Sequence, residues 1–202
     1  MIKKIVIIGP ESTGKTTLSE ELAKHFNTIF CPEYAREYLL QNGISYNYSD
    51  LIRIAQGQLA MEDYCDQVVN GELSMVSGKW SIAHDSLSTG SKLEVPSALL
   101  FIDTNMYVMK VWYEYVFNRC EQFVLDQIAQ RHYDLYLLCG TDLPWVAQPM
   151  REYPDRQQRL ELYDMYKDIL VNQQTPWVEI RGNNKERLQR AVDAVQQYCI
   201  QQ

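Results

Sequence analysis

The sequence lacks three features that would place it in a membrane, on nucleic acid or outside the cell. No apolar run approaches the roughly 20 residues that cross a bilayer, and the apolar stretch at residues 5–8 is too short for a signal peptide. Acidic residues outnumber lysine and arginine, and the net charge of −7 argues against a nucleic-acid partner. The five cysteines are scattered without metal-ligand spacing, which is typical of reduced thiols. We therefore expect a cytoplasmic protein with no membrane or nucleic-acid partner.

Strand and helix patterns alternate along the chain. Short apolar runs predict five strands, at residues 4–8, 28–31, 98–102, 135–139 and 177–180. Helical periodicity predicts helices at residues 17–26 and 33–41, and a longer helix that begins with Ser49 or Asp50 as N-cap and ends at about 69. It also predicts helical segments within 106–130, a helix after residue 156 that ends at about 172, and a last helix that begins near 184. This order predicts an α/β fold, with helices on both faces of a parallel sheet.

The length and composition suit one domain. The 202 residues, 46% of them hydrophobic, are enough to fill a single core, and we predict one domain over residues 1–202. Periodicity is lost at residues 70–96, which we interpret as an insertion, either flexible or folded as a small flap. The proline- and arginine-bearing stretch at residues 141–159 is predicted to form a lid.

Residues 9–16 read Gly-Pro-Glu-Ser-Thr-Gly-Lys-Thr, which matches the phosphate-binding pattern G-x-x-x-x-G-K-[ST] in full. Glycines let the backbone curl so that N–H groups point at a phosphate, and the dipole of the following helix adds to that positive field. Lys15 is expected to reach the β- and γ-phosphates, and the Thr16 hydroxyl to bind Mg²⁺. We therefore predict a P-loop NTPase three-layer fold that takes ATP and Mg²⁺, with the nucleotide held by Gly9, Glu11, Ser12, Thr13, Gly14, Lys15, Thr16 and Thr17.

The phosphate loop alone does not distinguish a GTPase, an ATPase motor and a small-molecule kinase. A GTPase normally carries the guanine motif Asn-Lys-x-Asp, and the nearest match, Asn184-Lys185-Glu186-Arg187, lacks the final carboxylate. No hexameric ATPase machinery is evident at this length. These observations favour a kinase.

Glu33 directly follows the second predicted strand. In a P-loop kinase this strand end faces the γ-phosphate, where a carboxylate can orient the acceptor hydroxyl and accept its proton. Arg36 lies one helical turn further on, so both side chains can point into one cleft. The alternative is a glutamate that caps the helix and forms a surface ion pair with Arg36. We favour the catalytic interpretation.

Asp103 ends the third predicted strand. A carboxylate at the tip of a buried strand is placed to hold Mg²⁺ directly or through water, so Asp103 is the second predicted metal ligand beside Thr16. Its alternative role, as the N-cap of the next helix, does not exclude metal binding, because Thr104 or Asn105 can cap that helix equally well.

The predicted lid and the residues after it carry further candidates. Arginines there can neutralise charge on a transferring phosphoryl group. We favour that role for Arg151, weigh it evenly for Arg156, and expect Arg159 on a solvated helix face. Trp145 is predicted to stack on an aromatic ring of the acceptor, with a core position as the alternative. For Asp142 the sequence does not distinguish between a role in binding acceptor hydroxyls and no role in the site.

Several motifs are combined in this chain: the phosphate loop, Glu33-Tyr34-Ala35-Arg36-Glu37-Tyr38, Phe101-Ile102-Asp103-Thr104, Tyr133-Asp134-Leu135 and Asp142-Leu143-Pro144-Trp145-Val146. Together they resemble the ribosylnicotinamide kinase domain of NadR-type proteins, over residues 2 to about 195 without the predicted insertion. The resemblance implies transfer of the ATP γ-phosphate to the 5′-hydroxyl of nicotinamide riboside, forming nicotinamide mononucleotide. It also implies that Glu33, Arg36, Asp103 and Trp145 surround the acceptor.

The chain departs from the family pattern in two places. Gln148-Pro149 stand where the family usually has Asp-Gly, and Asn105 stands where an acidic residue is common. The family's DNA-binding helix-turn-helix and adenylyltransferase motif are not visible, so neither repression nor dinucleotide synthesis is expected.

The leading prediction is a ribosylnicotinamide kinase, active in NAD biosynthesis, with Lys15, Glu33 and Arg151 as catalytic residues. A kinase for another nucleoside stays open as an alternative. So does a nucleotide-dependent regulatory or binding module with only weak ATP hydrolysis.

Overall fold

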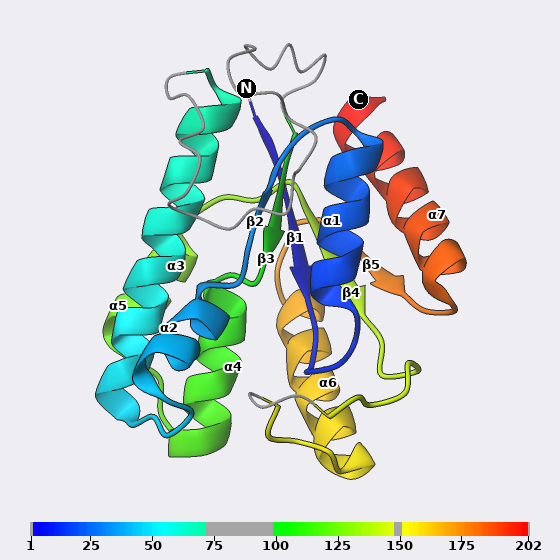
Figure 1. The fold of residues 1–202 in the computed structure, drawn as a ribbon. Coiled ribbons are helices and arrows are strands. Elements are labelled where there is room, and N and C mark those ends of the chain that lie inside the picture. The colour runs from blue at the N-terminus through cyan, green and yellow to red at the C-terminus, as the bar shows by residue number, and fades with distance from the viewer. Residues whose placement is uncertain (1, 72–98, 148–150, 202) are drawn as a thin grey trace.

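The computed structural model describes residues 2–71, 99–147 and 151–201 (Figure 1). Within these residues five strands form one parallel sheet with the spatial order β2-β3-β1-β4-β5. The strands are β1 (Lys3–Ile8), β2 (Phe30–Cys31), β3 (Leu99–Asp103), β4 (Leu135–Cys139) and β5 (Trp177–Ile180). The predicted fold class is thereby confirmed. The predicted insertion at 70–96 lies outside the described residues, apart from its first two positions.

The central strand explains why the sheet forms. The side chains of Ile5, Val6, Ile7 and Ile8 have no exposed surface, and β1 pairs with β3 on one side and β4 on the other. A continuous apolar run of this kind is buried on both faces of a parallel sheet. Full burial of each such side chain stabilises the fold by about 1.5–3 kcal/mol.

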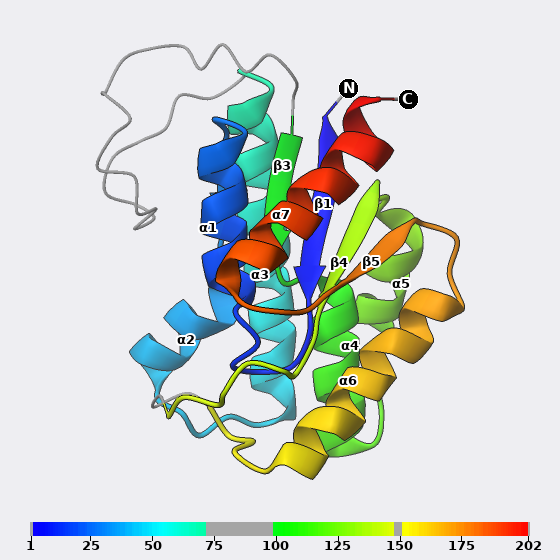
Figure 2. The same ribbon diagram turned by 90° about the vertical axis from the view of Figure 1, so that its right-hand side faces the viewer.

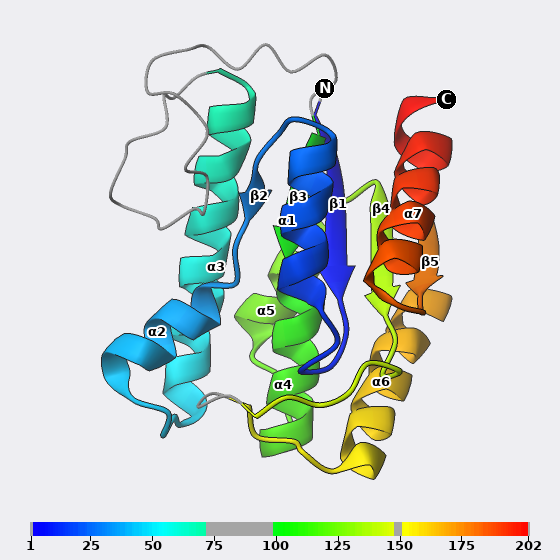
Figure 3. The ribbon, with the colours of Figure 1, turned by 45° about the vertical axis from the view of Figure 1, so that its right-hand side comes forward.

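Helices cover both faces of the sheet (Figures 2 and 3). One face packs on α1 (Lys15–His25), α7 (Asn184–Val195) and the π-helical turn η1 (Gln196–Ile200) that extends α7. The other face packs on α3 (Tyr48–Val69), α4 (Met106–Phe117) and α6 (Arg156–Val171). Alternating residues of each strand serve the two faces, so that Ile5 and Ile7 contact the first layer while Val6 and Ile8 contact the second.

A third apolar cluster lies among helices rather than on the sheet. It joins α2 (Tyr34–Asn42) and α5 (Gln122–Gln130) to α3 and α4, around the fully buried Tyr113. In Figure 1, α2 and the lower turns of α3, α4 and α6 project past the ends of the strand arrows, on the side of the molecule away from both chain termini. These projecting turns surround the space beyond the carboxyl ends of the strands.

Several predicted boundaries were wrong by a few residues. The second strand is confined to Phe30–Cys31; before it, the Thr28 hydroxyl donates to the carbonyl of Leu99 at 2.6 Å. The N-cap of α3 is Asn47, not Ser49 or Asp50; its side chain accepts from the backbone N–H of Asp50, whose side chain accepts from the Asn47 N–H in return.

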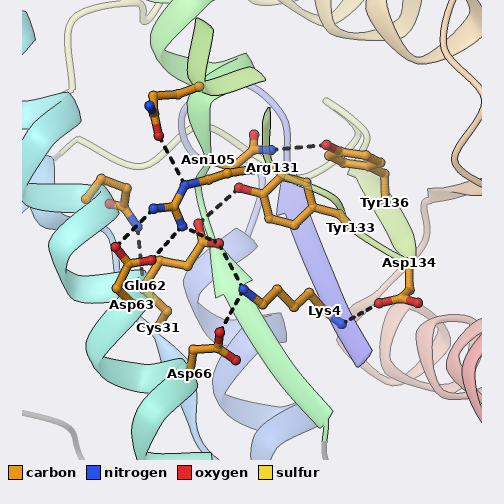
Figure 4. A network of polar contacts seen from close by, with 12 residues as sticks. Lys4, Cys31, Glu62, Asp63, Asp66, Asn105, Arg131, Tyr133, Asp134 and Tyr136 are labelled. Carbon is orange, nitrogen blue, oxygen red and sulfur yellow. Dashed lines mark hydrogen bonds and ion pairs between the residues drawn. The ribbon is translucent and has the colours of Figure 1, made fainter. Parts of the chain in front are cut away.

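A network of polar side chains ties α3 to the sheet (Figure 4). Glu62 is 1% exposed and accepts from Nη1 of Arg131 (3.1 Å) and from the hydroxyl of Tyr133 (3.0 Å). Lys4, on β1, forms an ion pair with Asp66 at 3.1 Å and lies 3.7 Å from Glu62. A buried carboxylate with this many partners is satisfied, so the network holds α3 in a fixed position against β1 and β4.

Candidate active site

The phosphate loop lies between β1 and α1, at the carboxyl ends of the parallel strands (Figure 3). Gly14 is the N-cap of α1 in the left-handed conformation (φ 77°), and no side chain caps the helix. The first turn of α1 contains no acidic residue. Its N–H groups are therefore available to an anion, which the helix dipole also favours.

The backbone of the loop needs glycine at its first position. Gly9 has φ 144°, and a Cβ there would lie 2.7 Å from the carbonyl oxygen of Cys139. The turn is closed from within, because the hydroxyl of Thr13 donates to the carbonyl of Pro10 at 2.7 Å. Nζ of Lys15 donates to the same carbonyl at 3.1 Å. The lysine amine is thus already folded over the hollow of the loop.

Thr16 and Asp103 meet beside the loop. The Thr16 hydroxyl donates to Oδ2 of Asp103 at 2.6 Å, and Asp103 has no exposed surface. Within the described part of the chain, Oδ1 of Asp103 has no hydrogen-bond partner. Burial first, and the nearby Glu33 carboxylate second, raise the pKa of Asp103 to about 6, while Lys15, the Thr16 hydroxyl and Arg36 act in the opposite direction. The two predicted metal ligands are therefore adjacent.

Glu33 occupies the N-cap position of α2, immediately after β2. Its side chain makes no capping hydrogen bond, so the structure does not support the alternative of a capping glutamate. It lines a cavity together with Lys15 and Arg36.

The segment after β4 folds back over the phosphate loop. Arg151 donates from Nη1 to the Ser12 hydroxyl (3.0 Å) and to the carbonyl of Val146 (2.6 Å). Glu11 accepts from the backbone N–H groups of Glu152 (2.8 Å) and Tyr153 (3.2 Å). Burial raises the pKa of Glu11 against the lowering effect of these two N–H groups. The predicted lid region therefore contacts the loop at two successive residues; positions 148–150 within it, including Gln148-Pro149, lie outside the described residues.

The cavity has a volume of about 330 Å³ and runs from the phosphate loop to an aromatic wall. The wall comes from α4, from the part of the predicted lid just before α6, and from α6; its members are Val108, Val111, Trp112, Tyr115, Tyr153, Leu162 and Tyr166. Nε1 of Trp112 donates to the hydroxyl of Tyr46 (2.8 Å), which donates to Oε2 of Glu152 (2.9 Å). This volume is within the range of small-ligand sites, and the aromatic wall suits a ring-bearing ligand.

Most of the predicted site residues lie together. The cavity is lined by every predicted nucleotide-binding residue and also by Glu33, Arg36 and Arg151. Asp103 lies behind Thr16 rather than on the surface of the cavity. Trp145 is not among the lining residues, and Trp112, which the sequence reasoning missed, is. The α4 segment reads as an apolar helix, so Trp112 resembled a core residue in the sequence.

Two other sequence expectations are changed by the structure. Arg159 is 6% exposed, so the expectation of a solvated helix face was wrong for this residue; Arg156 is exposed. Asp142 accepts from the N–H of Gly182 and from Arg187, both at 2.7 Å, and it does not line the cavity.

Arg187 is a residue that sequence reasoning missed. It is 3% exposed and donates to the carbonyls of Thr13 (2.8 Å) and Gly140 (3.0 Å) as well as to Asp142. It thereby connects α7 to the phosphate loop and to the end of β4. The only local signal is weak: Arg187 directly follows the capping box of α7, where a charged residue is ordinarily exposed.

This combination of a parallel sheet in the order β2-β3-β1-β4-β5 with a phosphate loop after its central strand defines a P-loop nucleotide-binding fold. A family model described as an AAA domain matches residues 4–76 and 87–187. The chain belongs to this family.

The chain is also similar to longer proteins called trifunctional NAD biosynthesis/regulator protein NadR. It is 25% identical to the one from Escherichia coli K12 and 24% identical to the one from Salmonella typhimurium LT2, each over 206 residues. Both alignments cover all of this chain but only 44% of the relative. The chain therefore spans less than half the length of these relatives.

Solved structures share the fold. A crystal structure of NadR protein in complex with NR has a TM-score of 0.69 at 23% identity, covering 98% of this chain and 49% of that one. Thymidylate kinase from Ehrlichia chaffeensis has a TM-score of 0.57 at 14% identity, with 96% and 98% covered. In the part of this chain that the structure describes, none of the helices is long and apolar enough to cross a membrane.

Proposed function

We propose that this protein is an ATP-dependent kinase that phosphorylates the 5′-hydroxyl of nicotinamide riboside, giving nicotinamide mononucleotide and ADP. The observation that carries the proposal is one continuous cavity that contains the phosphate loop, the Glu33 carboxylate and an aromatic wall. A phosphoryl donor and a ring-bearing acceptor can both enter this space, with a carboxylate between them. The similarity to two NadR proteins of NAD biosynthesis supports the choice of acceptor.

The donor side of the reaction is assigned to the phosphate loop. The open N–H groups at the start of α1 bind phosphate oxygens, and Lys15 leaves the carbonyl of Pro10 to reach the β- and γ-phosphates. Arg151 already lies at the loop through Ser12, where its charge stabilises the transferring phosphoryl group.

Thr16 and Asp103 fit a Mg²⁺ ion. Their oxygens are the hard ligands that Mg²⁺ prefers, and Oδ1 of Asp103 is a buried acceptor with no hydrogen-bond donor among the described residues. The described residues contain no cluster of three or more His, Cys, Asp or Glu that could hold a metal, so Thr16 and Asp103 are the residues that would hold Mg²⁺. Mg²⁺ bound here neutralises charge on the β- and γ-phosphates.

Glu33 is the proposed general base, and Asp103 is not. Glu33 lines the cavity, so its carboxylate can accept the proton of an acceptor hydroxyl as that hydroxyl attacks phosphorus. Asp103 is fully buried behind Thr16 and does not line the cavity. From these positions we assign Glu33 to the acceptor hydroxyl and Asp103 to the metal.

The acceptor ring is assigned to the wall around Trp112, with Tyr115 and Tyr153 beside it. Arg36 lines the same cavity and is placed to bind acceptor hydroxyls. We propose Trp112 for the stacking role that the sequence suggested for Trp145. The cytoplasm is the proposed location, because all five cysteines are free thiols.

The test is a panel of nucleosides incubated with the purified chain, ATP and Mg²⁺, with ADP release and phosphorylated product measured separately. Nicotinamide riboside should give nicotinamide mononucleotide in a one-to-one ratio with ADP. If another nucleoside is phosphorylated and nicotinamide riboside is not, the proposed acceptor is wrong, but the protein is still a kinase. ADP release that no acceptor accelerates would instead favour a nucleotide-dependent binding module.

A further inference from the structure

One side chain from a neighbouring helix holds the backbone on both sides of Glu33. Gln58, on α3, accepts at Oε1 from the N–H of Tyr34 (2.8 Å) and donates from Nε2 to the carbonyl of Pro32 (3.2 Å). The same Nε2 lies 3.6 Å from Sγ of Cys31, which Figure 4 places beside α3. The Gln58 side chain is 1% exposed. It therefore binds the chain immediately before and immediately after Glu33.

These contacts replace the ordinary cap of α2. The first N–H groups of a helix have no partner within the helix, and a side chain at the N-cap usually accepts from them. Glu33 is the N-cap, yet its side chain makes no such bond, and the N–H of Tyr34 binds Gln58 instead. Since Gln58 does the capping, the Glu33 carboxylate is left to line the cavity.

A glycine brings α3 close enough for this contact. At Gly57 a Cβ atom would lie 2.0 Å from Cε1 of the Tyr34 ring, so the ring rests directly on the helix. Adjacent positions of α3 thus fix the start of α2 in two ways, by ring packing at Gly57 and by hydrogen bonds at Gln58. The polar network of Glu62, one turn further along α3, holds the helix itself against the sheet.

We propose that Gln58 is a positioning residue that fixes the Glu33 carboxylate for proton transfer from the acceptor hydroxyl. The inference rests on the proposed role of Glu33. Gln58 does not line the cavity, so it acts through Glu33 and not on either substrate. Without its amide, the part-buried carbonyl of Pro32 and N–H of Tyr34 lose their hydrogen bonds to Gln58, and the segment between them is held less firmly. A displacement of about 1 Å at a reacting group can reduce the rate about 10²-fold.

The first experiment compares Gln58→Met with Gln56→Met. Methionine matches glutamine in length but makes none of the three contacts, and Gln56 carries the same change at an exposed position of the same helix. Gln58→Met should lower kcat about tenfold or more, with KM for ATP and for the nucleoside changed less than about twofold. Gln56→Met should match the wild type. Equal kcat for the wild type and a folded Gln58→Met would overturn the proposal.

The second experiment asks whether Gln58 acts through Glu33. In the Glu33→Gln background, Gln58→Met should lower kcat by less than about twofold further, because the group that it positions is already gone. If the two losses multiply in full, Gln58 has an independent effect and the proposal is wrong. If Gln58→Met only made the protein less stable, the two kcat losses would multiply in the double variant, and the second loss would not disappear.

The third measurement needs no turnover. Hydrogen exchange of the backbone around Tyr34 should be faster in Gln58→Met than in the wild type, and exchange in α7 should be unchanged. Unchanged exchange around Tyr34 would overturn the positioning role. The outcomes also separate this inference from the proposed function. If the wild type phosphorylates no nucleoside, both the proposed function and this inference are wrong. If the wild type is active but the kcat losses of the Glu33 and Gln58 variants multiply in full, only this inference is wrong.

Discussion

The hydroxyl of Thr16 donates a hydrogen bond to Oδ2 of Asp103 over 2.6 Å, which joins the first turn of α1 to the end of β3. The two residues are 87 positions apart in the sequence. They meet because β1 and β3 pair in register, with Ile7 opposite Asp103, so the residues that follow each strand emerge at the same edge. The two oxygen groups that we propose as metal ligands are therefore brought together by strand pairing.

Asp103→Asn is predicted to raise the Mg²⁺ concentration needed for half-maximal activity by about 10- to 100-fold. The amide keeps the size of the carboxylate and can still accept from Thr16, but it removes the negative charge that attracts the ion. Activity measured against Mg²⁺ at saturating ATP checks this. Asp164→Asn, an exposed acid on α6, is the matched control and should behave as the wild type. An unchanged Mg²⁺ requirement in Asp103→Asn would exclude Asp103 as a metal ligand.

Glu33→Gln is predicted to lower kcat by about 10² or more while nucleotide binding is retained. The amide cannot accept the proton of the acceptor hydroxyl, yet it fills the same space at the end of β2. Lys15→Ala provides the contrast, because it removes a contact to the phosphates and should weaken both ATP affinity and transfer. ATP-binding titrations and steady-state kinetics distinguish the two variants, because only Lys15→Ala should weaken ATP binding. A Glu33→Gln variant with unchanged kcat would remove Glu33 from the mechanism.

The fold and half of the site follow from local sequence signals. The phosphate loop is a contiguous motif whose geometry is set by its own glycines, and each strand is a run of apolar residues short enough to identify by itself. Glu33 and Asp103 were placed because each directly follows such a strand. Their placement beside the loop follows from the parallel pairing of β3 with β1 and β2.

The rest of the site depends on contacts that no local pattern reveals. Trp112 lines the cavity from α4, whereas the next residue, Tyr113, is fully buried in the helix cluster and does not line it. Arg187 and Gln58 are polar residues in helices, and such residues are usually exposed. Each is buried against carbonyl groups from a different part of the chain. Only the packed structure brings donor and acceptor together.

Trp112→Leu is predicted to raise KM for the nucleoside about tenfold or more, with KM for ATP nearly unchanged. Loss of the indole removes aromatic contact worth about 0.5–1.5 kcal/mol beyond buried area, together with the hydrogen bond to Tyr46. Trp145→Leu is the paired variant, since Trp145 does not line the cavity. Steady-state kinetics with both substrates varied gives the two constants. A larger nucleoside effect at Trp145 than at Trp112 would restore the sequence-based assignment.

The charged Asp142 side chain is predicted to stabilise the folded protein, and this stabilisation should be lost at acid pH. Burial by itself would raise the pKa of Asp142, but the N–H of Gly182 and the charge of Arg187 outweigh it and hold the pKa below its ordinary value. The unfolded chain therefore binds a proton at this site at a higher pH than the folded chain does. The stabilisation is complete above about pH 4, the ordinary pKa of aspartate, and is lost as pH falls through the lower pKa of the folded state.

Asp142→Asn should accordingly reduce the free energy of unfolding at pH 7 by about 1–2 kcal/mol, because a hydrogen-bonded charge is replaced by a neutral group. The difference from the wild type should narrow as pH is lowered below about 4, where the wild-type carboxylate also loses its charge. Urea unfolding of both proteins over this pH range measures it, with the exposed Asp164→Asn as the control that shows little difference throughout. A wild-type advantage that persists undiminished into acid would show that the Asp142 charge does not contribute.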